Sequence, residues 1–79
     1  MEASLRPVLL ASARLLLRPI VRLLLRGGVT FREFSELAKA SYVQVASEEF
    51  GLRGRPTNIS RIAILTGINR RDVARRRQD

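Results

Sequence analysis

The chain of 79 residues contains no cysteine and no histidine. Without cysteine it has no disulfide framework and no thiolate metal site. Without histidine it lacks the commonest metal ligand and the commonest general base of enzymes. The sequence also contains no glycine-rich phosphate loop that could complete a catalytic site with its few acidic residues. We therefore expect a protein that is not an enzyme and that binds neither a metal nor a cofactor.

The sequence also lacks long apolar runs and strand signals. No run reaches the ~18 apolar residues that span a bilayer, so no membrane span is expected. No β-hairpin signal is present, which favours an all-α fold. The absence of cysteine fits a cytoplasmic (nucleoid) location. A chain this short forms one domain and buries only roughly 60% of its unfolded surface, so dimerisation would enlarge a thin core.

Acidic residues are scarce, with seven against 15 basic residues, and the charges are segregated. Residues 1–28 hold five arginines and one glutamate (+4), residues 29–52 two basic and four acidic residues (−2), and residues 53–79 eight arginines and two aspartates (+6). This pattern indicates an anionic partner that meets the ends, chiefly the C-terminal one. All basic residues except Lys39 are arginine, whose planar fork matches phosphates and guanine edges. A GC-rich genome would explain the preference for arginine equally well, but not the segregation.

Two prolines divide the N-terminal region. Pro7 and Pro19 predict helices over residues 7–17 and 19–26, because proline suits a first helical turn and disfavours a helical residue before it. A single kinked helix through Pro19 is the alternative. Apolar residues recur at steps of three and four, at Leu9, Leu10, Ala13, Leu16, Leu17, Ile20, Val21, Leu24 and Leu25. Four arginines, at positions 14, 18, 22 and 26, recur on a different face.

A longer helix follows Gly27-Gly28, which end the first region. Thr30 and Glu33 have the spacing of a capping box, which predicts a helix over residues 31–49. Its predicted apolar stripe comprises Phe31, Phe34, Leu37, Ala38, Tyr42, Val45 and Ala46.

Residues 50–57 are predicted to form a loop, and residues 58–77 two short helices. The first begins after Thr57 or Asn58 and the second after Asn69, since these residue types cap helices. The predicted fold is therefore all-α, with no sheet: one domain over residues 1–79, a compact bundle of four or five short helices. Residues 7–49 would form its core and dimerisation region.

The segment from Ile59 to Arg77 resembles the helix-turn-helix superfamily. In that superfamily a small residue, a glycine four residues later, the apolar residue that follows, and an aliphatic residue six after the glycine hold two helices at a steep angle. The matching residues are Ile62, Ala63, Gly67, Ile68 and Val73, where Ile62 supplies the apolar neighbour of the alanine. The resemblance implies a fold that ends in a helix-turn-helix.

Two positions depart from this pattern. Thr66, just before the glycine, is usually apolar in the superfamily, and Arg76 is usually an aliphatic core residue. The last turn of the final helix therefore either frays or turns Arg76 toward phosphate.

The resemblance implies that the second helix of the motif enters the major groove while the first lies across the DNA backbone. We expect base contacts from Asn69, Arg70, Arg71 and Arg75, and phosphate contacts from Arg55, Thr57, Asn58, Ser60, Arg61, Arg76 and Arg77, with Arg53 beside them. Simpler interpretations stay open. Asn69 and Asp72 have the residue types and positions of helix caps, and capping alone would explain them. Residues 75–77 can equally form a basic tail that binds phosphate without sequence preference.

The whole chain also resembles the N-terminal part of an uncharacterised bacterial family. The shared runs are residues 16–25 (LLRPIVRLLL), 28–34 (GVTFREF) and 54–61 (GRPTNISR). This resemblance implies no function, and it implies that the chain is shorter than its relatives or a fragment.

The leading hypothesis is a small DNA-binding protein, a transcriptional regulator or nucleoid-type protein that forms a homodimer through its first helices. RNA as the nucleic acid stays open. An arginine-rich and leucine-rich amphipathic segment over residues 1–26 would also suit a membrane surface or a targeting signal. A protein-interaction adaptor whose arginines meet acidic protein is the third hypothesis.

Overall fold

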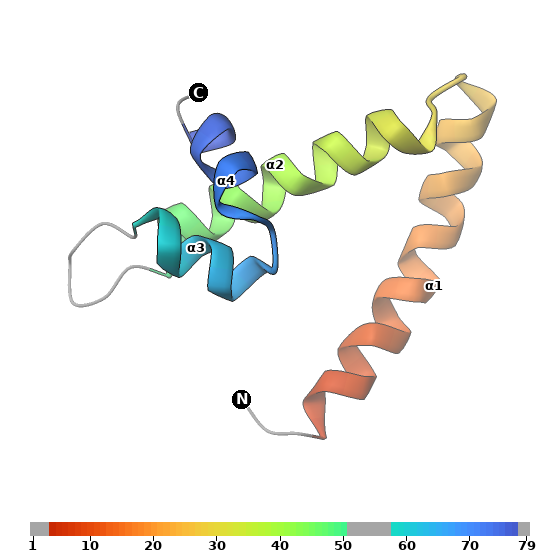
Figure 1. Cartoon of the computed structure of the whole chain (residues 1–79). Helices are drawn as coiled ribbons and strands as arrows, with labels where there is room; N and C mark the ends of the chain where they lie inside the picture. The colour runs from red at the N-terminus through yellow and green to blue at the C-terminus, as the bar shows by residue number, and fades with distance from the viewer. Residues whose placement is uncertain (1–3, 51–57, 78–79) are drawn as a thin grey trace. The chain divides into compact units, whose positions relative to one another are not determined.

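The computed structural model describes residues 4–50 and 58–77 (Figure 1). This part of the chain forms four helices and no strand: α1 (Leu5–Arg26), α2 (Phe31–Glu49), α3 (Ile59–Thr66) and α4 (Arg70–Arg77). The predicted all-α class is confirmed, although α1 and α2 are long rather than short. The chain divides into two compact units, residues 1–31 and 32–79, so that α1 lies in the first unit and α3 and α4 lie in the second with nearly all of α2.

A single helix of 22 residues passes through Pro19, so the prediction of two helices was wrong and its alternative of one helix holds. Pro19 has no N–H to donate to the carbonyl of Leu15, which costs about 3 kcal/mol in a helix interior. The surrounding residues offset this loss, since leucine and arginine, which are strong helix formers, occur on both sides of the proline.

The end of α1 is closed by three backbone hydrogen bonds around its two glycines. The N–H groups of Gly27, Gly28 and Val29 donate to the carbonyls of Leu23, Leu25 and Leu24, at 3.1, 3.2 and 2.9 Å. Gly28 has a φ of 78°, in the left-handed region that favours glycine. These bonds form a Schellman motif, so the predicted stop at Gly27-Gly28 is confirmed.

Helix α1 contains no buried residue. None of the helices described combines the length and apolar character required to cross a bilayer.

The core of the second unit joins α2, α3 and α4. Ile62 and Val73 are fully buried, and Val43 and Ala46 of α2 lie against them at 2% and 5% exposure. Partly buried apolar side chains surround this cluster, namely Ile59, Ala63 and Ile68. Four of the five residues that carried the sequence resemblance are therefore core or core-packed residues, and the fifth, Gly67, forms the turn between α3 and α4.

The face of α2 that packs against this core is not the predicted one. Ala46 is buried as expected, but Val43 was missed, and Tyr42 and Val45 are 62% and 44% exposed. Apolar residues occur on two faces of α2, so their spacing alone did not select the face that contacts α3 and α4. The second apolar face stays exposed at the surface.

Candidate functional site

The turn between α3 and α4 depends on Gly67. This residue has a φ of 76°, and its N–H donates to the carbonyl of Ala63 at 2.9 Å, which closes the C-terminus of α3. The left-handed backbone reverses the chain within three residues, so that α4 begins at Arg70. Glycine suits this position because it adopts the left-handed conformation without strain.

Thr66 is tolerated where the superfamily usually has an apolar residue, because its hydroxyl both donates and accepts a hydrogen bond. Its Oγ1 donates to the carbonyl of Ile62 at 2.7 Å and accepts from the N–H of Ile68 at 3.2 Å. The hydroxyl thus joins the last turn of α3 to the first residue after Gly67 and stiffens the turn.

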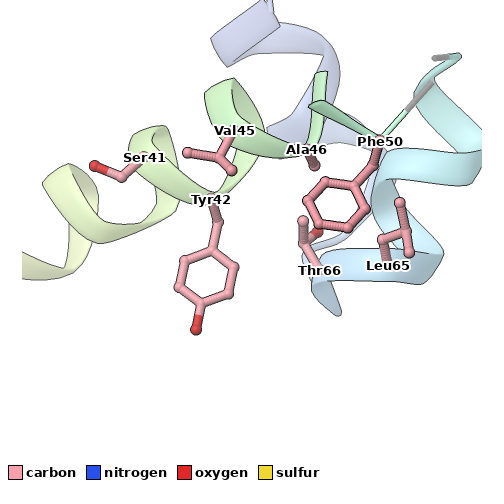
Figure 2. A pocket seen from close by; sticks show the side chains of 7 residues that line it. All are labelled: Ser41, Tyr42, Val45, Ala46, Phe50, Leu65 and Thr66. Carbon is pink, nitrogen blue, oxygen red and sulfur yellow. The ribbon is translucent and has the colours of Figure 1, made fainter. Parts of the chain in front are cut away.

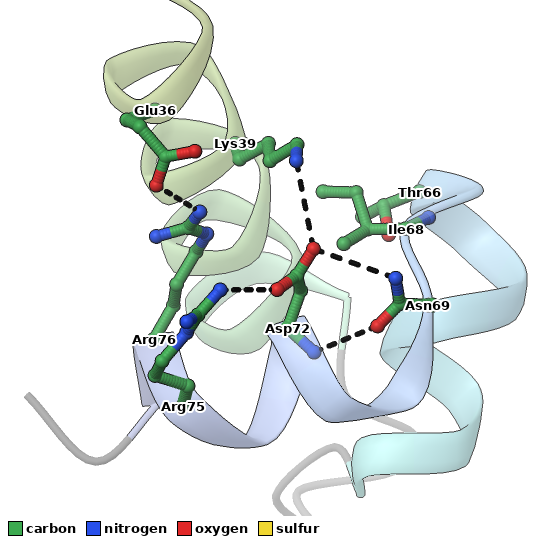
Figure 3. Close-up of polar contacts among 8 residues, drawn as sticks. All are labelled: Glu36, Lys39, Thr66, Ile68, Asn69, Asp72, Arg75 and Arg76. Atoms are coloured by element: carbon green, nitrogen blue, oxygen red, sulfur yellow. Dashed lines mark hydrogen bonds and ion pairs between the residues drawn. The ribbon is translucent and has the colours of Figure 1, made fainter. Parts of the chain in front are cut away.

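Asparagine side chains cap both short helices: Asn58, one of the two predicted alternatives, caps α3, and Asn69 caps α4 as predicted. Asn58 Oδ1 accepts from the N–H of Arg61 at 2.8 Å, and Asn69 Oδ1 accepts from the N–H of Asp72 at 2.8 Å. The amide nitrogen of Asn69 also donates to Asp72 Oδ2 at 3.4 Å, so that both ends of this amide contact one residue (Figure 3). The interpretation of Asn69 as a cap is therefore supported, and its reading of a base stays a prediction.

Asp72 is the centre of the polar cluster in Figure 3. Its side chain is 15% exposed, with Lys39 Nζ of α2 at 3.5 Å and the guanidinium of Arg75 on its other oxygen. Burial opposes the charged form, but Lys39 and Arg75 outweigh it and hold the pKa of Asp72 below its ordinary value. The carboxylate therefore does more than cap α4, since it also joins α4 to α2.

Arg76 points toward α2 and not away from the core. Its side chain is 13% exposed and its guanidinium forms an ion pair with Glu36, which lowers the pKa of that carboxyl. Its buried Nε has no hydrogen-bond partner. The sequence suggested either a frayed last turn or an Arg76 that faces phosphate, and neither describes this arrangement. Arg76 lies within α4, and the carboxylate of Glu36 balances its charge.

The outward face of α4 carries three arginines. Arg70, Arg71 and Arg75 are exposed, whereas Val73 on the inner side is fully buried. Arg71 and Arg75 are one helical turn apart and therefore lie on the same face. The ion pair of Arg75 with Asp72 is a surface pair, since the arginine side chain is 67% exposed, and such pairs contribute little and exchange readily.

Only some of the residues that were predicted to contact phosphate lie among those that the structure describes. Asn58 is exposed, and Ser60 and Arg61 are half-buried at the start of α3, where Arg61 Nε donates to the carbonyl of Phe50 at 3.4 Å. Arg53, Arg55 and Thr57 lie outside the described residues, as does the side chain of Arg77, whose backbone ends α4.

Two residues that hold α4 in place were not assigned this role from the sequence. Glu36 and Lys39 are three residues apart, and they lie on the same side of α2 as the buried Val43, four residues beyond Lys39. A sequence signal exists, because oppositely charged residues at this spacing face the same neighbour. This signal identifies the partners of α4 only when the buried face of α2 is already known. Among the described residues, no three His, Cys, Asp or Glu side chains gather in a way that could hold a metal ion.

Comparison with known proteins identifies the family of the chain. The chain belongs to a family of unknown function (DUF6502), whose family model matches residues 6–77. No curated protein and no solved structure matches the chain.

Proposed function

We propose that this member of the family binds duplex DNA, with α4 as the recognition helix in the major groove and α3 across the DNA backbone. The observation that carries the proposal is the division of α4 into two sides. One side is fixed by Val73, Asp72 and Arg76, and the other presents Arg70, Arg71 and Arg75 to solvent. Two helices joined by a short turn that often contains glycine, with the second helix free to enter the major groove, are typical of helix-turn-helix proteins.

Different roles follow for the residues of the site. Arg71 and Arg75 share the outermost face of α4 and are the best candidates for base contacts, since an arginine fork pairs with guanine O6 and N7. Arg70 is the first residue of α4, and its guanidinium contacts either a base edge or a phosphate. Asn69 positions Asp72, and Arg76 anchors α4 to α2, so we assign neither of them a main contact with DNA.

The start of α3 supplies phosphate contacts in this proposal. The first N–H groups of a helix have no intrahelical carbonyl and favour an anion. Asn58 already caps Arg61, so Ser60 and the guanidinium of Arg61 are the side chains on α3 closest to this role. The proposed regulator is a homodimer, because one recognition helix reads only a few base pairs and two half-sites increase specificity. The predicted interface, residues 7–49, carries most of the exposed apolar side chains.

The test is duplex binding by the double variant Arg70→Ala/Arg71→Ala. Each bidentate base contact is worth about 1–3 kcal/mol, so affinity for a specific duplex should fall roughly 10-fold or more. The slope of log K against log salt should decrease by up to about 1.8, or about 0.9 for each phosphate that the variant no longer neutralises.

The matched control is Arg6→Ala/Arg26→Ala, which removes two exposed charges from the ends of α1. Binding is measured by fluorescence anisotropy over a salt series, and helicity by circular dichroism. Equal losses of affinity in the two variants would show that overall charge, and not α4, drives binding. Unchanged affinity in the α4 variant would remove the proposed recognition helix.

A further inference from the structure

An apolar groove lies on the second unit, at the C-terminal end of α2 where α3 approaches. It is lined by Ser41, Tyr42, Val45, Ala46, Phe50, Leu65 and Thr66. Figure 2 shows the Phe50 ring beside Leu65 and Thr66, while the Tyr42 ring projects from α2. Four large side chains of this groove are exposed, namely Tyr42, Val45, Phe50 and Leu65, so the groove is lined almost entirely by uncovered apolar surface.

The apolar stripe of α1 is the complementary feature. It is uncovered within its own unit, and eleven large aliphatic side chains of α1 are 39–70% exposed. At about 100° per residue these side chains occupy more than half of the helix circumference. With roughly 80–100 Å² exposed on each, they present on the order of 1,000 Å², above the few hundred Å² that monomeric proteins leave uncovered and close to the ~800 Å² per partner of a stable interface.

The charges beside these two surfaces are opposite. Within α1 every ionisable side chain is an arginine, and Arg14, Arg18 and Arg22 run directly beside the apolar line that contains Leu17 and Val21. Beside the groove, in contrast, α2 carries Glu48 and Glu49, which lie three and four residues after Val45 and hence on the same side of the helix. The last turn of α2 contains no basic residue, and its carbonyl end adds partial negative charge.

We propose that the groove of one copy binds the central turns of α1, residues 14–22, from a second copy of this chain. Leu17 and Val21 enter the groove between Tyr42 and Leu65, and the neighbouring arginines meet the acidic end of α2. The proposed exchange is reciprocal: the α1 of each copy lies in the groove of the other, so that the two identical contacts double the buried area around a two-fold axis and close the assembly as a dimer. The inference rests on the dimer proposed above and specifies both of its surfaces.

A charge-exchange experiment tests this pairing. The α1 variant is Arg18→Glu/Arg22→Glu, and the groove variant is Glu48→Arg/Glu49→Arg. Like charges then oppose one another in each homodimer, so each variant alone should raise the dimer dissociation constant at least ~10-fold. In an equimolar mixture the heterodimer again has opposite charges facing one another, so the dimer should return. Mass is measured by sedimentation equilibrium of the full chain without DNA, and helicity by circular dichroism.

A second pair of variants tests the apolar contact. Val45→Asp places a charge in the groove and should give a monomer. Leu37→Asp changes a side chain of similar exposure on α2 outside the groove, and should leave the dimer intact. Wild-type mass for the charge variants, failure of the mixture to dimerise, or equal effects of the two aspartates would overturn the pairing. A wild-type chain that stays monomeric and sediments with anionic phospholipid vesicles would overturn it as well.

The test of this interface can succeed or fail independently of the test of DNA binding. The four exchanged residues lie outside α3 and α4, so a monomeric variant should still bind a short duplex with one half-site. A dimer that forms as described but binds no duplex would refute the DNA-binding function and leave the interface intact.

Discussion

Gly67→Ala should destabilise the second unit through the backbone alone. With a φ of 76°, an L-residue at this position costs about 1–2 kcal/mol. A Cβ added here would have no atom within 4 Å, so no steric clash contributes. Alanine also restricts the unfolded chain, which returns about 0.4–1 kcal/mol. The net loss of stability should be about 1 kcal/mol, which lowers the melting temperature of so small a unit by about 5 °C or more.

The assay is native-state hydrogen exchange at two amides of the core. The N–H of Ile62 donates to the carbonyl of Asn58 at 3.0 Å, and that of Val73 to Asn69 at 3.1 Å. A destabilisation of about 1 kcal/mol should speed exchange at both amides roughly fivefold. Gly67→Asn should cost less, because asparagine tolerates the left-handed region better than other residues.

Gly27→Ala is the matched control. Gly27 has a φ of −87°, and its added Cβ would make ordinary contacts at 3.7 and 3.8 Å, so this variant should be neutral or slightly stabilising. If Gly67→Ala exchanged as slowly as the wild type, the left-handed turn between α3 and α4 would not exist in solution.

Two further predictions concern the ion pairs that hold α4. Arg76→Leu should keep or raise the urea midpoint, because it replaces a largely buried cation with an unpartnered Nε by an apolar side chain; a lower midpoint would show that the pair with Glu36 is needed. Stability should also fall on acidification. Glu36 and Asp72 have folded pKa values below their ordinary 4.5 and 3.8, so their contribution is complete above these values and is lost as the pH falls through the folded ones. With no histidine to titrate, the urea midpoint should be nearly constant from about pH 5 to 7. A variant carrying Glu36→Gln and Asp72→Asn should depend less on pH below about 4.5, and equal slopes would contradict this assignment.

The sequence predicts the features that depend on a few neighbouring residues. The caps at Asn58 and Asn69, the left-handed Gly67 and the stop of α1 at Gly28 are each fixed by local backbone geometry, which one or two residue types satisfy. For the same reason the start and end of α2 were predicted correctly.

One error was local, because Pro19 disfavours a helix but the helix formers on both sides carry α1 through it. The other errors arose where tertiary packing decides between local alternatives. The buried face of α2 was misjudged because Val43 and Val45 are equally apolar, and only contact with α3 and α4 distinguishes them. The partner of Arg76 is Glu36, forty residues away in the sequence, and no local pattern joins the two. For the candidate site, the sequence therefore identified the residues of α4 but not which of them face solvent and which hold α4 against α2.

The charge density of α4 has a consequence for protein engineering. Five of its eight residues are arginine, and an isolated helix of this length is marginal in water even without repulsion between like charges. Its order therefore depends on its packing against α2, including the contact of Asp72 with Lys39, and on the burial of Val73. A peptide copied from this segment, or the same eight residues grafted onto a foreign scaffold, would be an arginine-rich coil, and the ordered outward face of α4 could be transplanted only together with the α2 surface beneath it.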